Sequence, residues 1–310
     1  MTRRFRLAGL TAVSASLRHG LGRPRHTIAD YLALTKPGIL SLLLATTLGG
    51  MLAGAAGLPP LSLVIATLIG GALAAGGANA LNCYIDRDID QEMHRTRHRA
   101  TATGRISPRA ALVFGIAISA LAMVVFLVFV NWLAALLALI GNLYYVLVYT
   151  MWLKRRTPQN IVIGGAAGAV PPMVGWAAAT GDLAVAAFIL FAIIYYWTPP
   201  HFWALALLKQ GEYGRAAVPM LPVVAGEAET RRQVLLYSVL LAAVSLMLTP
   251  FGFGAIYFAG AVVLNGLFLW LAIVVYRQAT KRAARHLFFY SLWYLAFIFA
   301  AMVADRLVLA

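Results

Sequence analysis

Charged residues are scarce in this sequence. Only 11% of its 310 residues are Asp, Glu, Lys or Arg, whereas 62% are hydrophobic and the mean hydropathy is +0.83. Soluble domains have about 25% charged residues. The composition therefore excludes an ordinary soluble protein and indicates an integral membrane protein. Because no charged stretch is long enough for a separate soluble domain, we expect a single membrane domain over residues 31–310.

Cysteine is almost absent. The chain has one cysteine, Cys83, which excludes an internal disulfide and any metal site built from several thiolates. A metal ion bound here should therefore have oxygen or nitrogen ligands. We expect Cys83 itself to be a small packing residue rather than a catalytic thiol.

Long apolar runs, in contrast, are abundant. Each is close to the roughly 20 residues that a helix needs to cross a bilayer. We expect nine such spans, at about 38–57, 61–84, 110–130, 132–151, 160–179, 183–207, 233–250, 254–276 and 286–304. Proline pairs fall within two of them, and the backbone carbonyls that proline leaves unpaired must find partners or face a cavity. The sequence predicts an all-α, polytopic membrane protein with nine helices around a central cavity.

Acidic residues are few, and ten Asp and Glu against 25 Lys and Arg give a net charge of +15. In a soluble protein this excess would suggest nucleic acid as a partner. Here the Lys and Arg residues gather before the first span and in every second loop. The loops between, near residues 58–60, 131, 180–182 and 251–253, contain none.

This alternation predicts the topology of the chain. Cytoplasmic loops of membrane proteins carry the excess of Lys and Arg, so we expect the N-terminus inside and the C-terminus outside. The positive charge is then explained by the orientation of the chain in the membrane. We therefore expect the lipid bilayer, rather than nucleic acid, as its partner. We expect residues 1–30 to be a basic, disordered tail on the inner side rather than a transit peptide.

Three oxygen-bearing side chains recur every fourth residue at the end of the second span. These are Asn82, Asp86 and Asp90, in the stretch N-C-Y-I-D-R-D-I-D. On a helix this spacing keeps them on nearly one face, about 6 Å apart along the axis. Carboxylates at a membrane boundary are costly and usually functional. Two carboxylates and an amide suit Mg²⁺, which typically binds one or two carboxylates together with substrate phosphate.

Basic side chains directly follow these acids. Arg95, Arg97 and Arg99 could bind phosphate oxygens through their planar guanidinium groups, although an inner loop should carry arginines in any case. Lys36, where the first span begins, is either an interfacial anchor or a further contact to a diphosphate. The acidic and basic groups together predict a site for a metal-bridged diphosphate.

A second acidic group comes between the sixth and seventh spans. We expect long inner loops after the second and sixth spans, each of about 25 residues, and seven of the ten acids fall within them. Long loops in compact proteins are usually functional. The chemistry should therefore lie on the cytoplasmic side, between these two loops.

At this point the sequence resembles a known family. The N-x-x-x-D-x-x-x-D pattern, followed by Arg95, Thr96 and Arg99, is similar to the first signature of the UbiA superfamily of intramembrane prenyltransferases. Three further stretches resemble the branch of that family that farnesylates haem. They are L-K-R-R-T-P-Q-N-I-V-I-G-G-A-A-G-A-V-P-P-M-V-G-W (153–176), Y-W-T-P-P-H-F-W-A-L-A-L (196–207) and V-P-M-L-P-V-V (218–224). The resemblance covers residues 31–232.

The resemblance implies an enzyme of the bacterial inner membrane. It would transfer a farnesyl group from farnesyl diphosphate to a vinyl group of haem b with addition of water, giving haem O, the substrate of a downstream haem A synthase. Asn82, Asp86 and Asp90 would bind Mg²⁺ and act in catalysis. The resemblance adds Glu212 as a further metal ligand, where the family usually has Asp, and Tyr213 beside it. Diphosphate would contact these two residues together with Lys36, Arg95 and Arg99.

The acceptor site is a separate expectation. His201 follows two prolines and lies among aromatic residues, of which Trp197 and Trp203 could face the haem or the prenyl chain. A haem substrate needs apolar walls and could use an axial nitrogen. His201 is equally well explained as a hydrogen-bonded structural residue.

Two other functions remain open from the sequence. A related prenyltransferase with a quinone or chlorin acceptor would share the first signature. A haem-binding membrane transporter would also place charged groups near a cavity, although no internal repeat of the kind common in transporters is visible. Magnesium dependence separates an enzyme from a passive carrier.

Overall fold

The computed structural model describes residues 27–55 and 57–309. Within these ranges the regular elements are all helical, and nine helices are long and apolar enough to cross a membrane. They are α3 (Pro37–Gly54), α4 (Leu61–Ile85), α6 (Pro108–Phe129), the continuous segment Trp132–Arg155 that begins with α7 (Trp132–Leu143), α8 (Asn160–Thr180), α9 (Val185–Arg215), Gly226–Phe251 containing α11 (Gly226–Leu246), α12 (Ala255–Gln278) and α13 (Lys281–Leu309). The predicted fold class and its nine spans are confirmed.

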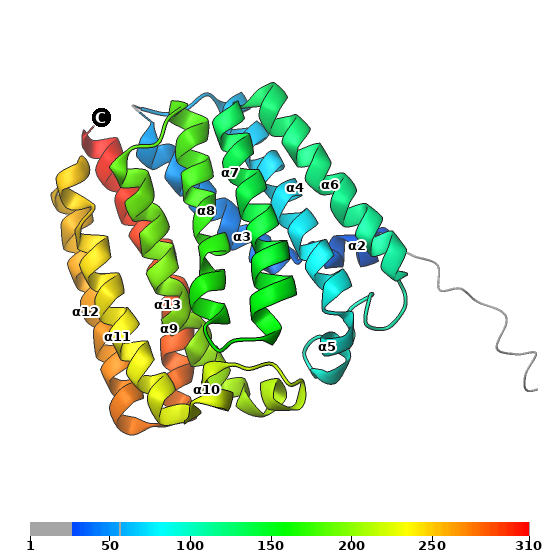
Figure 1. Cartoon of the computed structure of the whole chain (residues 1–310). Coiled ribbons are helices and arrows are strands. Elements are labelled where there is room, and N and C mark those ends of the chain that lie inside the picture. The colour runs from blue at the N-terminus through cyan, green and yellow to red at the C-terminus, as the bar shows by residue number, and fades with distance from the viewer. Residues whose placement is uncertain (1–26, 56, 310) are drawn as a thin grey trace, which may run out of the picture.

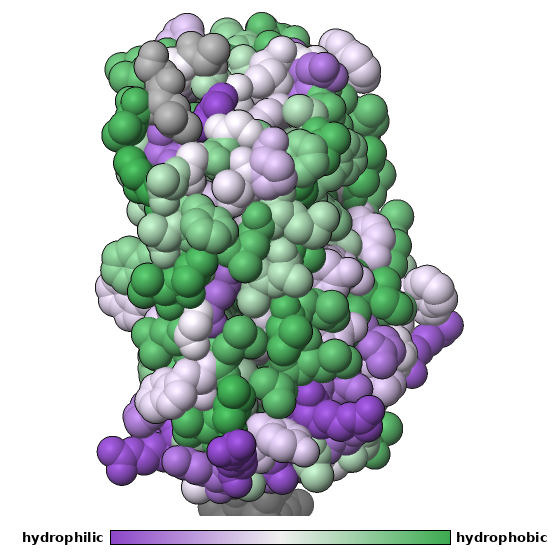
Figure 2. Space-filling view, turned by 90° about the vertical axis from the view of Figure 1, so that its left-hand side faces the viewer, coloured by the Kyte–Doolittle hydropathy of each residue, from purple (hydrophilic) through white to green (hydrophobic). Residues whose placement is uncertain are grey.

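The helices stand side by side and alternate in direction (Figure 1). Helix α4 packs along α6, and α3 packs along α8, which in turn lies against α9. The last three helices form a group on the other side of α9, since both α11 and α13 contact it. Figure 2 shows that most of the visible face is hydrophobic, with hydrophilic residues concentrated at its lower end.

The loops that carry Lys and Arg share one end of the molecule. The short helices α5 (Arg87–Glu92) and α10 (Leu221–Val224) lie there, at the lower end in Figure 1, together with the turn between α12 and α13. The C-terminus lies at the opposite end (Figure 1). The alternation of charged and uncharged loops in the sequence thus places the positive charge at one end of the folded molecule. Which end faces the cytoplasm stays a prediction.

Two boundaries differ from those expected. The long loop predicted after the sixth span is mostly helical, because α9 continues to Arg215 and α11 begins at Gly226. Polar residues extend α9 past its apolar part, with a kink at Lys209 (φ −118°, ψ 17°). Glu212 therefore lies on a helix rather than in a loop.

The N-terminal boundary also differs. Residues 28–30, expected in the disordered tail, begin helix α2 (Ile28–Leu34). A reciprocal capping interaction between Thr27 and Asp30 stabilises this start, because each side chain bonds the other residue's backbone N–H. Asp30 also pairs with Arg105 at 3.0 Å. The rest of the predicted tail, residues 1–26, lies outside the described residues.

Glycines allow α3 and α8 to approach closely. A Cβ atom on Gly175 would lie 1.9 Å from the backbone oxygen of Thr47, and one on Gly50 would lie 2.1 Å from that of Pro172. Small residues bring helices together in this way in membranes. This contact fixes α3 and α8, and both helices line the central cavity.

We expect Gly175→Ala to destabilise the protein by about 2 kcal/mol, because the added methyl group would push two backbones apart. The measurement is thermal unfolding in detergent. Gly168→Ala is the matched control on the same helix, since nothing lies within 4 Å of its Cβ position. Equal unfolding temperatures for the two variants would show that the close approach of α3 and α8 does not limit stability.

Candidate active site

Asn82, Asp86 and Asp90 lie where α4 gives way to α5. Asp86 stands at the break between the helices (φ −86°, ψ 6°). The four-residue register nevertheless continues across it, since Asp86 N–H donates to the Asn82 carbonyl at 2.9 Å and Asp90 N–H donates to the Asp86 carbonyl at 2.8 Å. All three side chains are buried. The structure thus brings together the three residues that the spacing placed on one face.

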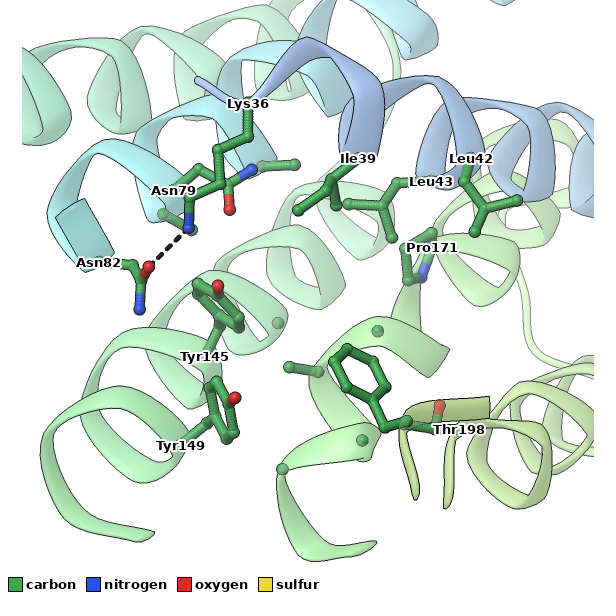
Figure 3. Close-up of a pocket in the computed structure, with 18 of the residues that line it drawn as sticks. Lys36, Ile39, Leu42, Leu43, Asn79, Asn82, Tyr145, Tyr149, Pro171 and Thr198 are labelled. Atoms are coloured by element: carbon green, nitrogen blue, oxygen red, sulfur yellow. Dashed lines mark hydrogen bonds between the residues drawn. The ribbon is translucent and has the colours of Figure 1, made fainter. Parts of the chain in front are cut away.

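Each member of this triad has a cationic partner. Lys36 Nζ donates to Asn82 Oδ1 at 2.6 Å (Figure 3). Arg99 Nη1 contacts both carboxylate oxygens of Asp90, at 2.9 and 2.8 Å. The two carboxylates of the triad are therefore buried beside cations that neutralise them, the arrangement in which buried carboxylates are tolerated.

Asp86 is the most enclosed of the three. Its side chain is fully buried, and Oδ2 accepts hydrogen bonds from Lys154 Nζ and from Asn82 Nδ2, the latter at 2.8 Å. Asn82 and Lys154 line the cavity and Asp86 does not. An ion that binds Asp86 Oδ2 from the cavity would therefore compete with the contacts that Lys154 and Asn82 make to that oxygen.

The fourth membrane segment reaches the triad through a widened turn. Residues Tyr144–Trp152 form a π-helix, a distortion that occurs mostly at functional sites. Thr150 donates to the carbonyl of Tyr145 five residues earlier, at 2.8 Å, and its hydroxyl accepts from Asn82 Nδ2 at 3.1 Å. The rings of Tyr145 and Tyr149 both turn toward the cavity (Figure 3).

The oxygen atoms of the triad fit a hard divalent cation. Asp86 Oδ1 is buried without a hydrogen bond, since the nearest guanidinium nitrogen of Arg155 is 3.8 Å away. In the part of the chain that the structure describes, no group of three Asp, Glu, His or Cys side chains could hold a metal alone. Mg²⁺ commonly binds through one or two carboxylates and takes its remaining ligands from phosphate and water.

Asp88 points away from this site. It pairs with Arg155 through two contacts of 2.7 Å and is exposed. The hydrogen bonds from Arg155 lower the pKa of the Asp88 carboxyl to about 2 despite an opposing effect of partial burial. Asp88 therefore remains ionised and holds Arg155 at the edge of the site.

The cavity has a volume of about 500 Å³ and joins two different environments. Its polar end is lined by Lys36, Asn82, Asp90, Arg95, Arg99 and Lys154. Apolar side chains line the remainder, among them Ile39, Leu42, Leu43 and Pro171 (Figure 3). A mainly apolar wall with a few convergent polar groups is typical of a small-molecule site.

The second acidic group lies beside the cavity. Tyr213 lines it, whereas Glu212 pairs with Lys209 at 2.8 Å and does not. Glu212 Oε2 is buried and makes no hydrogen bond. Arg95 lies on the cavity wall, near enough to Glu212 and Tyr213 to interact electrostatically with both. Arg95 thus lies between the cavity and the second acidic group, and Glu212 is not grouped with Asp86 and Asp90.

The aromatic residues of α9 divide into two groups. His201 and Trp197 line the cavity, and their rings stack with centroids 4.3 Å apart. Trp203, expected at the same site, is 1% exposed and packs edge-on against Tyr237 instead. Successive residues of a helix point in different directions, and Trp203 falls on the face toward α11.

Several cavity residues were missed by the sequence reasoning. Lys154 belongs to the L-K-R-R-T-P stretch, where an inner loop should carry positive charge in any case. Tyr145 and Tyr149 gave a signal only as a pair spaced four apart in an apolar span. Phe288 and Leu292 come from α13, which has no recognisable motif, so nothing in the sequence pointed to them.

The comparisons with known proteins agree on one family. The family model "UbiA prenyltransferase family" matches residues 43–297. A protoheme IX farnesyltransferase of Chloroflexus aurantiacus is 58% identical over 92% of this chain, and one of Thermus thermophilus is 53% identical over 91%. The chain spans about half the length of these relatives, 49% and 46%. A protoheme IX farnesyltransferase of Parvibaculum lavamentivorans is 47% identical, and the match covers 93% of this chain and 91% of the relative.

Solved structures share the fold. A digeranylgeranylglyceryl phosphate synthase superposes with a TM-score of 0.76 over 91% of this chain and 99% of its own, at 17% identity. A UbiA homologue from Archaeoglobus fulgidus, bound to GPP and Mg²⁺, superposes with a TM-score of 0.63 over 88% of this chain and 99% of its own, also at 17% identity. At this identity the likeness concerns the arrangement of helices.

Proposed function

Because this chain belongs to the UbiA prenyltransferase family, we propose that it transfers a farnesyl group from farnesyl diphosphate to a vinyl group of haem b, giving haem O. The relatives named protoheme IX farnesyltransferase support this acceptor. The observation that carries the proposal is the cavity itself. It joins a cationic end, where the Asp90 carboxylate also lies, to an apolar interior that contains His201 between aromatic rings.

The cationic end would bind the diphosphate. Lys36, Arg95, Arg99 and Lys154 all line the cavity there, and positive groups held in place before the reaction are most effective where charge develops. As the C–O bond breaks, the negative charge on the departing diphosphate increases. Lys36 could stabilise this charge, since the contact with Asn82 holds its ammonium group at the cavity wall.

Mg²⁺ would be held by Asn82, Asp86 and Asp90, and when bound it would neutralise the diphosphate and make it a better leaving group. The buried Asp86 Oδ1, which accepts no hydrogen bond, supports this assignment. Lys154 would turn from Asp86 toward the substrate phosphate, exchanging one anionic partner for another. Glu212, whose Oε2 makes no hydrogen bond, would bind the diphosphate indirectly, either through Arg95 or through a second metal ion.

The apolar interior would hold the farnesyl chain and the haem. Leaving with the electron pair of the C–O bond, the diphosphate gives an allylic cation, which the ring faces of Tyr145 and Tyr149 can stabilise. A vinyl carbon of haem b attacks this cation to form the new C–C bond. Water adds to the resulting cation and loses a proton, so the product gains one farnesyl group and one hydroxyl.

The loops that carry Lys and Arg would face the cytoplasm of a bacterial cell, with the protein in the inner membrane. The cavity's cationic end lies toward these loops, because Arg95 and Arg99 follow α5. Water-soluble diphosphate would then be released on the cytoplasmic side. Haem O would pass to a haem A synthase.

The direct test is the mass of the product. Purified protein in detergent, given haem b, farnesyl diphosphate and Mg²⁺, should yield a haem heavier by one farnesyl group and one hydroxyl group. A quinone precursor and a chlorin are each offered in place of haem b in parallel reactions. Prenylation of one of these in place of haem would retain the diphosphate site and refute the acceptor.

A further inference from the structure

His201 is held by residues from the last helix. Its Nδ1 lies 2.6 Å from the hydroxyl oxygen of Ser291 on α13. Phe288, one turn earlier on α13, stacks on the imidazole with ring centroids 4.8 Å apart and an interplanar angle of 23°. Trp197 covers the other face at 4.3 Å and 15°. The imidazole is therefore clamped between two rings, and α13 supplies both a clamp and a hydrogen-bond partner.

The direction of the hydrogen bond to Ser291 can be deduced. A serine hydroxyl has one proton, and that of Ser291 is donated to the carbonyl of Phe288 at 2.6 Å. Ser291 Oγ can then only accept from His201, so the proton between them belongs to Nδ1. In a neutral imidazole with Nδ1 protonated, Nε2 carries a free lone pair.

This lone pair is available to the cavity. His201 lines the cavity, and Nε2 makes no hydrogen bond to any residue that the structure describes. Ring rotation that would exchange the nitrogens is blocked by Trp197 and Phe288, which occupy the two faces. Trp197 is itself fixed, because its indole N–H donates to the carbonyl of Ser291 at 2.8 Å.

We propose that Ser291 is a positioning residue that holds His201 as the Nδ1–H tautomer, so that Nε2 is presented to the cavity as an axial ligand for the iron of the haem substrate. A histidine nitrogen with a free lone pair is a common haem ligand, and the hydrogen bond at the other nitrogen sets which one is available. The identity of this ligand rests on the proposed function, whereas the tautomer does not.

The assignment gives the C-terminal helices a part in recognising the acceptor. Groups for the diphosphate and its metal ion come from the start of α3, from α4, from the loop after α5 and from the segment Trp132–Arg155. His201 and its two partners come from α9 and α13. Ligation of the iron by His201 would place the porphyrin against α9 and α13 and leave its edge free to meet the farnesyl chain.

The tautomer can be tested without haem. Protein labelled with ¹⁵N-histidine has six histidines, and comparison with His201→Gln identifies the signals of His201. We expect a protonated Nδ1 and an unprotonated Nε2 in the parent protein, and a shift toward the Nε2–H form in Ser291→Ala. Ser291→Thr keeps the hydroxyl and should restore the parent signals. An Nε2–H form in the parent protein would overturn the proposal.

Haem binding tests the role of Nε2. Ferric haem b should give the absorption spectrum of a histidine-ligated haem, and His201→Ala should lose it. Ser291→Ala should bind haem about tenfold more weakly, as expected for a misplaced ligand, and Ser291→Thr should restore the affinity. Ser238→Ala is the matched control, because Ser238 is equally buried and bonds only its own helix.

The product assay separates the two possible failures. If the parent protein makes no farnesylated haem and binds none, the proposed function fails and the iron ligand fails with it. If the parent makes the product while Ser291→Ala keeps the parent tautomer and haem spectrum, only the role of Ser291 is overturned.

Discussion

Asp86→Asn is expected to reduce farnesyl transfer by about 1000-fold or more. The substitution removes the buried carboxylate whose Oδ1 accepts no hydrogen bond and leaves an amide of nearly the same shape. Loss of a charged metal ligand weakens the binding of the ion that neutralises the departing diphosphate in the transition state. A 1000-fold loss of rate corresponds to an increase of about 4 kcal/mol in the activation free energy. Product formation by mass spectrometry, at saturating Mg²⁺, measures the change.

The control for this variant is Asp88→Asn. The two positions lie two residues apart and receive the same substitution, but the Asp88 side chain is exposed and pairs with Arg155, whereas that of Asp86 is fully buried and bonded to Lys154 and Asn82. It should retain activity within a few-fold of the parent. Since Asp86→Asn also leaves the Lys154 ammonium without its carboxylate, thermal unfolding must show that the variant is folded. A folded Asp86→Asn protein with activity within tenfold of the parent would refute the metal role.

Removal of divalent cations is expected to have an effect of similar size. Chelation should abolish transfer, and Mg²⁺ should restore it, because the triad supplies only part of the coordination and the diphosphate the rest. In the absence of metal, Lys154 and Arg99 neutralise the carboxylates, so the protein should stay folded. The measurement is the rate of product formation against free Mg²⁺ concentration.

Haem binding provides the internal control for this experiment. His201 and its partners lie on α9 and α13 and share no contact with the triad, so chelation should leave the haem spectrum unchanged. Transfer that persists at full rate without divalent cations would show that Lys36, Lys154 and the arginines suffice for the diphosphate. Loss of haem binding on chelation would show instead that the metal supports the whole cavity.

Much of the fold follows from local sequence. Nine apolar runs of bilayer length predict nine helices, and most of their limits agree to within a few residues because the membrane sets the hydrophobic length. An exception is α11, which begins at Gly226 rather than near residue 233. The largest error concerned α9, which extends to Arg215. Hydropathy shows where the apolar part of a helix ends. The helix itself can continue beyond that point, because its backbone hydrogen bonds do not depend on apolar side chains.

The triad was also readable from the sequence. Asn82, Asp86 and Asp90 share a face because the four-residue spacing is a property of the helix, and it survives the break at Asp86 since the hydrogen bonds on either side persist. Trp203 shows the limit of such reasoning. Its position two residues from His201 in the chain suggests a shared role, but two residues along a helix are a turn of about 200°.

Only the tertiary structure decided which side chains of different helices contact one another. Lys154 meets Asp86 across 68 residues, and Ser291 meets His201 across 90. Neither pairing follows from spacing or composition, because packing between helices far apart in the sequence determines it. The sequence by itself determined that this is a nine-span membrane protein with a carboxylate and arginine site at one boundary. The cavity that joins this site to His201, and the proton on Nδ1 that leaves Nε2 free, required the helices to be assembled.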